Sequence, residues 1–198
     1  MPTIVITGGP CAGKTTALSF LASALEEHGW QVVLVPECAT ALIAAGIAPW
    51  TSSRLDFQTA VFELQLAQED VFVAASRRVK ADHVLVICDR GLMDGKGYLS
   101  DEEFDALLEA HGLTEHDANA RYDAVYHLES TAKGIQRAYT LENNASRFED
   151  SSEAISVDER IVASWASHPH RVLIQNEDRF EQKATHLLNE VLAFLGQA

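Results

Sequence analysis

The sequence predicts an α/β fold, with one domain over residues 1–198 and a parallel sheet of five strands in a three-layer sandwich. Short apolar runs rich in β-branched residues alternate along the chain with segments of helical periodicity. A helix between two consecutive strands favours parallel pairing through right-handed crossovers. The glycine-rich stretch "GGPCAGKTT", residues 8–16, directly follows the first apolar run and is typical of a phosphate-binding member of this class.

Five apolar runs are the predicted strands, and helical patterns lie between them. The predicted strands are residues 4–6, 31–35, 83–88, 124–128 and 171–175. The predicted helices include residues 17–25, 38–46, 57–75 and 180–195.

Capping and breaking residues indicate two more helices. Ser100 and Glu103 form the pattern of a capping box, in which each side chain satisfies the backbone N–H of the other residue. Another helix is expected to begin near residue 151 and to carry Trp165. Pro169 is expected to end that helix and to lead into the last strand.

The loop after the first strand predicts a nucleotide site, because Gly8, Gly13, Lys14 and Thr15 match the pattern G-x-x-x-x-G-K-[ST]. Lys14 is expected to reach the β- and γ-phosphates, and the Thr15 hydroxyl to bind Mg²⁺. The N-terminus of the following helix favours an anion at the same place. The residues expected to contact the nucleotide here are Gly8, Gly9, Pro10, Cys11, Ala12, Gly13, Lys14, Thr15 and Thr16.

Composition argues against several kinds of partner. The formal net charge is −14, from 15 Lys and Arg against 29 Asp and Glu, so neither nucleic acid nor an anionic membrane is expected to bind. The sequence has no apolar stretch long enough to span a bilayer and no secretory leader, so we expect a soluble, cytoplasmic protein. Its three cysteines lack C-x-x-C spacing, which indicates reduced thiols.

Ligands of open parallel sheets bind beyond the carboxyl ends of the strands, so charged residues that follow a strand are candidate site residues. Asp89 follows the third strand and is expected to hold Mg²⁺ opposite Lys14 and Thr15, the alternative being a helix cap or a surface ion pair. Arg90 is expected to pair with a phosphate or carboxylate of a second substrate. Asp94, in the same glycine-containing loop, is a further candidate for that substrate.

Glu37, at the end of the second strand, is the candidate general base. A carboxylate there faces the same crevice and could take a proton from an attacking hydroxyl, which would make the protein a kinase; the alternative is an exposed loop acid. Trp50 is expected either to stack on a base or to cover the core. Gln58, near the start of a long helix, is a candidate contact for the same acceptor.

Residues 137–150 form a polar stretch without apolar periodicity, in the position of a lid over the triphosphate. Arg137 is expected to contact the nucleotide, and Arg147 to contact the β- or γ-phosphate and to act in catalysis. A surface salt bridge from Arg147 to Glu149 or Asp150 is the alternative.

Several stretches, in order and spacing, resemble the AAA-28 family of P-loop NTPases: "GGPCAGKTT", "VPECAT", "CDRGLMDG" and "YDAVYHLE". The same residues are similar to the kinase domain of bacterial ribosylnicotinamide kinases. Residues 143–176 resemble the branch that contains the fly TRP-channel translocation-defect protein. The resemblance implies a kinase-like P-loop fold, with strand order 2-3-1-4-5, that binds ATP or GTP with Mg²⁺.

Two classes of function are compatible with these residues. In the first, the protein transfers the γ-phosphoryl group of ATP or GTP to a hydroxyl of a small molecule, with Lys14 and Mg²⁺ neutralising the phosphates and Glu37 or Asp89 handling the proton. In the second, it is a nucleotide-dependent switch or scaffold with slow hydrolysis. A base beside an acceptor pocket favours the enzyme, while the acceptor itself is not indicated by the sequence.

Overall fold

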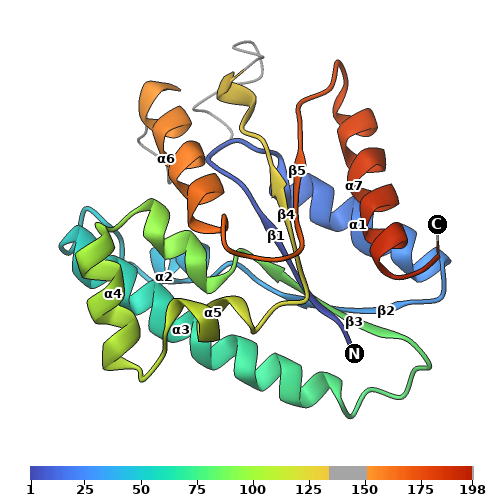
Figure 1. The fold of residues 1–198 in the computed structure, drawn as a ribbon, viewed down its shortest axis with the longest axis horizontal. Coiled ribbons are helices and arrows are strands. Elements are labelled where there is room, and N and C mark those ends of the chain that lie inside the picture. Colours follow the sequence, from blue (N-terminus) through green and yellow to red (C-terminus); the bar gives the residue numbers. More distant parts are fainter. Residues whose placement is uncertain (134–150, 198) are drawn as a thin grey trace.

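The computed structural model describes residues 1–133 and 151–197, which form an α/β sandwich around one sheet (Figure 1). The strands are β1 Thr3–Thr7, β2 Gln31–Val35, β3 Val84–Asp89, β4 Ala124–Leu128 and β5 Arg171–Ile174. All neighbouring strands pair in parallel, in the order β2-β3-β1-β4-β5. The predicted fold class and strand order are therefore confirmed.

Helices cover both faces of the sheet. The α-helices are α1 Lys14–Glu27, α2 Cys38–Ala44, α3 Arg54–Ser76, α4 Asp101–Ala110, α5 Glu115–Asn119, α6 Ser151–Ser164 and α7 Phe180–Phe194. The short 3-10 helices are η1 Leu92–Gly97 and η2 Thr131–Lys133. Within the described residues, no helix is both long and apolar enough to cross a membrane.

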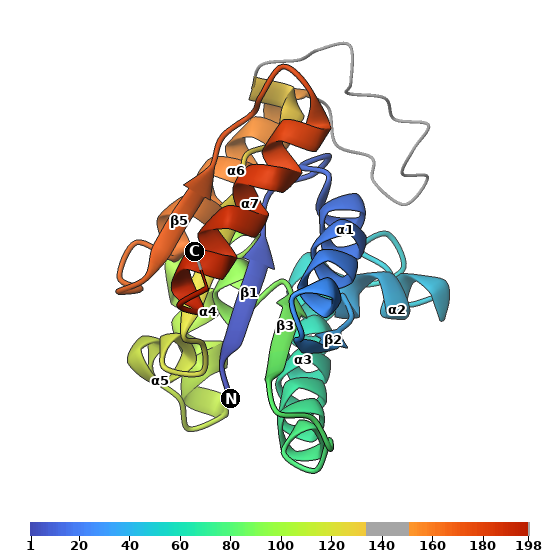
Figure 2. The same cartoon turned by 90° about the vertical axis from the view of Figure 1, so that its right-hand side faces the viewer.

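The central strand β1 separates two hydrophobic cores. Ile4 and Ile6 belong to the core under α1 and α7, which Figure 2 turns toward the viewer. Val5 belongs to the opposite core, which α3, α4 and α6 cover. Successive side chains of a strand point to opposite faces, so a strand covered on both sides must be apolar throughout. This explains why β1 reads as an uninterrupted apolar run.

Local predictions differ from the structure at a few places. β3 continues through Asp89, because Asp89 still pairs in register with Ile6 of β1. α5 was not predicted, since its five residues are too few to show periodicity. α6 ends at Ser164, so the prediction that it carries Trp165 is wrong by one residue. The capping box of Ser100 and Glu103 is confirmed.

The carboxyl ends of the strands meet at one edge of the sheet. The loop after β1, Glu37 after β2, Asp89 at the end of β3 and Glu129 after β4 all lie there. Parallel pairing therefore brings together residues that are far apart in the sequence.

Candidate nucleotide site and the neighbouring cavity

The loop between β1 and α1 has the backbone shape of a phosphate-binding loop. Gly8 and Gly13 have positive φ angles of 151° and 82°, which L-residues rarely adopt. A Cβ atom at Gly8 would lie 2.4 Å from the carbonyl oxygen of Leu128, and one at Gly13 would lie 2.7 Å from the ring of Phe180. Both glycines are therefore required by the conformation and by the close packing around the loop.

Side chains from Ser130 and from η2, α6 and α7 hold the loop. The Gly9 N–H donates to Asp158 Oδ1 at 2.8 Å. Three carbonyl oxygens of the loop accept hydrogen bonds from these side chains: Pro10 from Ser130 (2.7 Å), Cys11 from Thr131 (2.9 Å) and Ala12 from Lys183 (3.1 Å). Because these carbonyl groups point at the donors, they point away from the inside of the loop. This favours a loop interior lined by N–H groups, which can bind an anion.

Lys14 and Asp89 lie on the inner side of this loop. Lys14 is 7% exposed, and its Nζ lies 3.4 Å from the carbonyl oxygen of Gly8. Asp89 Oδ1 is buried and makes no hydrogen bond within the described part of the chain. Burial is the main cause that raises the pKa of Asp89, and the negative charge of Glu37 raises it further. The positive charge of Lys14 lowers the pKa but does not cancel the rise.

These residues fit a Mg²⁺ ion. A buried carboxylate oxygen without a partner is an expensive arrangement unless a cation binds to it. Mg²⁺ prefers oxygen ligands, and the Thr15 hydroxyl at the start of α1 and the Asp89 carboxylate are of that kind. Thr15 and Asp89 are thus the residues that would hold the ion.

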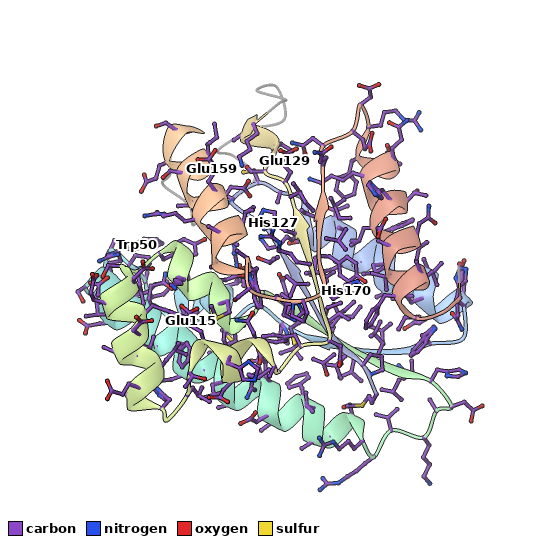
Figure 3. The ribbon with its side chains drawn as sticks, viewed as in Figure 1. Trp50, Glu115, His127, Glu129, Glu159 and His170 are labelled. Atoms are coloured by element: carbon purple, nitrogen blue, oxygen red, sulfur yellow. The ribbon has the colours of Figure 1, made fainter. Side chains whose placement is uncertain are left out.

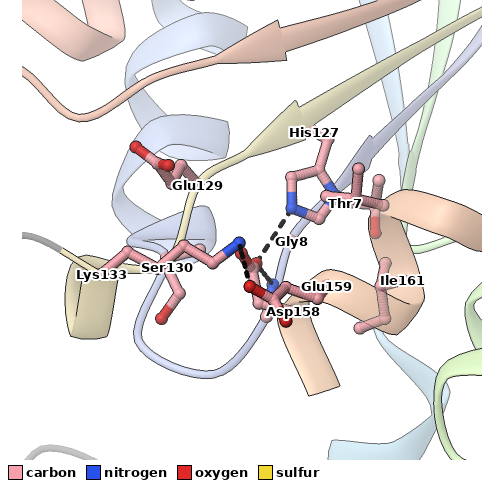
Figure 4. Close-up of polar contacts among 12 residues, drawn as sticks. Thr7, Gly8, His127, Glu129, Ser130, Lys133, Asp158, Glu159 and Ile161 are labelled. Atoms are coloured by element: carbon pink, nitrogen blue, oxygen red, sulfur yellow. Dashed lines mark hydrogen bonds and ion pairs between the residues drawn. The ribbon is translucent and has the colours of Figure 1, made fainter. Parts of the chain in front are cut away.

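Asp158 of α6 forms a buried ionic cluster beneath the loop (Figure 4). Its Oδ1 lies 2.9 Å from His127 Nε2, and its Oδ2 lies 3.0 Å from Lys133 Nζ. Burial alone would raise the pKa of Asp158, but the contacts with His127, Gly9 and Lys133 outweigh it and lower the pKa to about 2. The carboxylate is therefore ionised at neutral pH and links β4, η2 and the loop.

Lys183 of α7 is the second buried charge that the sequence analysis did not identify. Besides Ala12, its Nζ donates to the carbonyl oxygen of Glu129 at 2.6 Å and to Asn176 Oδ1 at 3.0 Å. Burial lowers the pKa of Lys183 to about 8, although the charges of Glu129 and Asp158 oppose the shift. One ammonium group thus ties together the loops after β1, β4 and β5.

The helical pattern of the sequence contains a signal from which Asp158 and Lys183 could have been identified as buried charges. Asp158 follows Val157 on the apolar stripe of α6, and Lys183 precedes Ala184 on that of α7. A charged residue on an apolar stripe has to find partners inside the protein.

Glu37 and Arg90 form an ion pair beside the phosphate loop. Arg90 Nε lies 2.6 Å from Glu37 Oε1, and Arg90 Nη1 donates to the Gly8 carbonyl oxygen at 3.2 Å. The other Glu37 oxygen accepts from Thr40 Oγ1 at 2.6 Å. Arg90 has a left-handed φ of 73° and is 6% exposed. The guanidinium that the sequence analysis assigns to a second substrate is thus engaged by the protein's own acids.

Asp94 is likewise engaged within the protein. Its Oδ2 accepts from Thr7 Oγ1 at 2.6 Å and lies 3.3 Å from the Arg90 guanidinium. Its Oδ1 accepts from Trp165 Nε1 at 2.6 Å. Asp94 therefore fixes η1 against β1 and against Trp165, the residue directly after α6, and a contact with a substrate stays a prediction.

A cavity of about 380 Å³ opens beside Glu37 and Arg90, between α2, α3 and η1; we call it the α3 cavity. Residues of the sequence analysis that line it are Glu37, Trp50, Gln58, Arg90 and Asp94. Trp50 is 55% exposed at the end of the molecule (Figure 3), which does not fit the alternative that it covers the core. Arg137 and Arg147, with Glu149 and Asp150, lie outside the described residues.

The sheet order, the phosphate loop after the central strand and the helix that follows it define a P-loop NTPase. Comparison with protein families agrees, because a family profile described as an AAA domain, that of the AAA-28 family, matches residues 3–183. The chain belongs to this family. No match was found in a comparison with curated proteins. Fold and family together make the protein a nucleotide-binding domain.

Proposed function

We propose that the protein transfers the γ-phosphoryl group of ATP or GTP to a hydroxyl of a small molecule bound in the α3 cavity, in a Mg²⁺-dependent reaction. The observation that supports this is the position of Glu37. Its carboxylate lines the cavity and is linked through Arg90 to Gly8 of the phosphate loop. A carboxylate at this junction would face both a bound triphosphate and the acceptor.

On the nucleotide side, the loop amides and Lys14 would bind the phosphates. Mg²⁺ held by Thr15 and Asp89 would neutralise charge on the β- and γ-phosphates. The outer hydrogen bonds from Asp158, Ser130 and Lys183 support this role, because they fix the loop before the nucleotide arrives. A preformed loop loses little further freedom on binding.

On the acceptor side, Glu37 would receive the proton. The acceptor oxygen forms a bond to the γ-phosphorus, the bond from that phosphorus to the bridging oxygen breaks, and the nucleoside diphosphate leaves. Arg90 and Thr40 hold the Glu37 carboxylate in one orientation. Because phosphoryl transfer passes through a loose transition state, positioning matters more than a strong base.

The test is a transfer assay with γ-labelled ATP and GTP and a panel of nucleosides, vitamins and sugars. We expect label in a phosphorylated acceptor, and no label with the variant Lys14→Ala. The result that would contradict transfer is hydrolysis of the nucleotide at a rate that none of the acceptors changes, with no label in any acceptor. That result would favour the switch function.

A further inference from the structure

Lys183 of α7 carries a buried ammonium group next to the phosphate loop. The residue is 3% exposed. Its Nζ donates to the carbonyl oxygen of Ala12 at 3.1 Å, to that of Glu129 at 2.6 Å and to Asn176 Oδ1 at 3.0 Å. These acceptors belong to the loops that follow β1, β4 and β5, so one nitrogen atom connects three loops at the carboxyl edge of the sheet.

The three acceptors match the three N–H groups of an ammonium ion. A protonated lysine has three donors, whereas the neutral amine has two donors and a lone pair. If Lys183 loses its proton, at least one of the three oxygens loses its donor, and the lone pair of Nζ then faces an oxygen atom. Both changes cost free energy at a buried position, because the acceptor has already lost its water. The arrangement therefore requires the charged form.

The bond to Ala12 sets the direction of an amide group of the phosphate loop. The Ala12 carbonyl and the Gly13 N–H belong to one planar trans peptide group, so they point in opposite directions. Because Lys183 binds the carbonyl, the Gly13 N–H points toward the inside of the loop. Without this bond the peptide group can rotate more freely, since Gly13 has no side chain to restrain it.

The other two contacts of Lys183 reach the phosphate loop through Ser130. Asn176 Nδ2 donates to the Ser130 carbonyl oxygen at 2.9 Å, and the Glu129 carbonyl is part of the peptide group that precedes Ser130. Ser130 Oγ in turn donates to the Pro10 carbonyl oxygen at 2.7 Å. Whichever contact the neutral amine gives up, the effect therefore reaches the loop.

The charges around Lys183 determine when it loses its proton. Burial is the main influence and lowers the pKa of Lys183 to about 8, against the opposing charges of Glu129 after β4 and Asp158 of α6. The phosphate loop and the start of α1 add the titratable side chains of Cys11 and Lys14. A bound nucleotide brings negative phosphates to this loop, which favours the protonated form of a nearby amine.

We propose that Lys183 is a positioning residue for the nucleotide, whose ammonium group holds the phosphate loop in its binding shape, so that a deprotonated Lys183 takes up a proton when the nucleotide binds. Lys183 acts through the loop and not by contact with a phosphate, because its three N–H groups are already used. Only nucleotide binding is involved, so the same behaviour is expected with or without phosphoryl transfer.

The direction of the pH effect follows from linkage. The nucleotide favours the protonated form, so affinity is complete below the pKa of Lys183 in the free protein and falls as the pH rises through 8. The dissociation constant should be about tenfold larger at pH 9 than at pH 7.

Calorimetry with ADP and GDP in Mg²⁺ measures the proton directly in the wild-type protein. At pH 8 the phosphates of both nucleotides are ionised, and about half of the free protein has lost the Lys183 proton. Binding should therefore take up roughly half a proton, which appears as a binding enthalpy that changes with the ionisation enthalpy of the buffer.

Lys183→Met removes the charge and keeps the apolar stem. It should bind nucleotide at least about tenfold more weakly than the wild type at pH 7, with a smaller difference at pH 9 and without the proton uptake at pH 8. Lys80→Met is the matched control and should behave as the wild type, because Lys80 is exposed between α3 and β3, at the opposite edge of the sheet.

Lys183→Arg tests the same point if Lys183→Met does not fold. Its guanidinium stays protonated at pH 8, so the proton uptake should vanish whatever the affinity of the variant. Equal wild-type affinity at pH 7 and pH 9, no proton uptake by the wild type at pH 8, or unchanged uptake in either Lys183 variant would overturn the proposal. The last of these results would assign the proton to Cys11 or Lys14 instead.

Discussion

Replacing Asp158 by Asn should destabilise the protein by about 2 kcal/mol at pH 7. Asn keeps an oxygen for the Gly9 N–H but removes the charge that faces Lys133 and His127. The magnitude follows from the pKa of Asp158, which is about 2 in the fold against 3.8 for a free side chain. Each unit of difference is worth about 1.4 kcal/mol, and a domain of this size should lose roughly 4–8 °C in melting temperature.

The pH dependence of this effect has a defined sign. A depressed carboxyl pKa stabilises the fold above the unfolded value, near pH 4, and the contribution is lost as the pH falls toward 2. Urea unfolding of wild type and variant should therefore give a constant difference between pH 7 and pH 5 that shrinks below pH 4.

Glu159→Gln is the control for Asp158→Asn. Glu159 is the next residue of α6 and lies 3.8 Å from the same Lys133 nitrogen, but its side chain is 65% exposed. Removing the Glu159 charge should lower the free energy of unfolding by less than about 1 kcal/mol. If both variants cost the same at pH 7, or if the Asp158→Asn difference is unchanged at pH 3, the cluster does not act through a buried charge.

Three further changes test the site. Lys14→Ala should abolish binding of ATP and GTP in calorimetry with an unchanged melting temperature, and a folded variant with normal affinity would remove the phosphate-loop assignment. Asp89→Asn should weaken nucleotide binding more in Mg²⁺ than in EDTA, whereas equal losses would indicate a structural role. Glu37→Gln should lower the rate of phosphoryl transfer by about 10²-fold or more while nucleotide affinity barely changes, and a normal rate would show that Glu37 is not the base.

Much of the fold could be predicted because the sheet is covered on both faces. The predicted limits of β2 and β4 agree with the structure, since each is a short apolar run between turn-forming residues. The phosphate loop follows a strand, so the other loops that follow strands were expected to lie at the same edge of the sheet. Asp89 and Glu37 could be selected in this way before any distance was known.

The interior polar contacts could not be predicted with the same reasoning. Asp158 is 149 residues from Gly9 along the chain, and Lys183 is 171 residues from Ala12. Periodicity shows that such a residue lies on a helix, but the partner that makes its burial tolerable is defined only by packing. Arg90 and Asp94 are a further case, because the pairing of these two charges beside the site was not predicted, while their predicted contacts with a substrate stay predictions.

The engaged charges also explain how a strongly acidic protein can keep a site for a polyanion. Lys183 and Arg90 donate to carbonyl oxygens of the loop, and Lys133 pairs with Asp158, the buried acid that binds the Gly9 N–H. These cations fix the loop backbone, directly or through Asp158, in a shape that would present N–H groups to the phosphates. Affinity for the nucleotide would then depend on the geometry of the loop more than on the net charge of the surface. Salt should accordingly affect nucleotide binding less than it affects binding that relies on exposed charges.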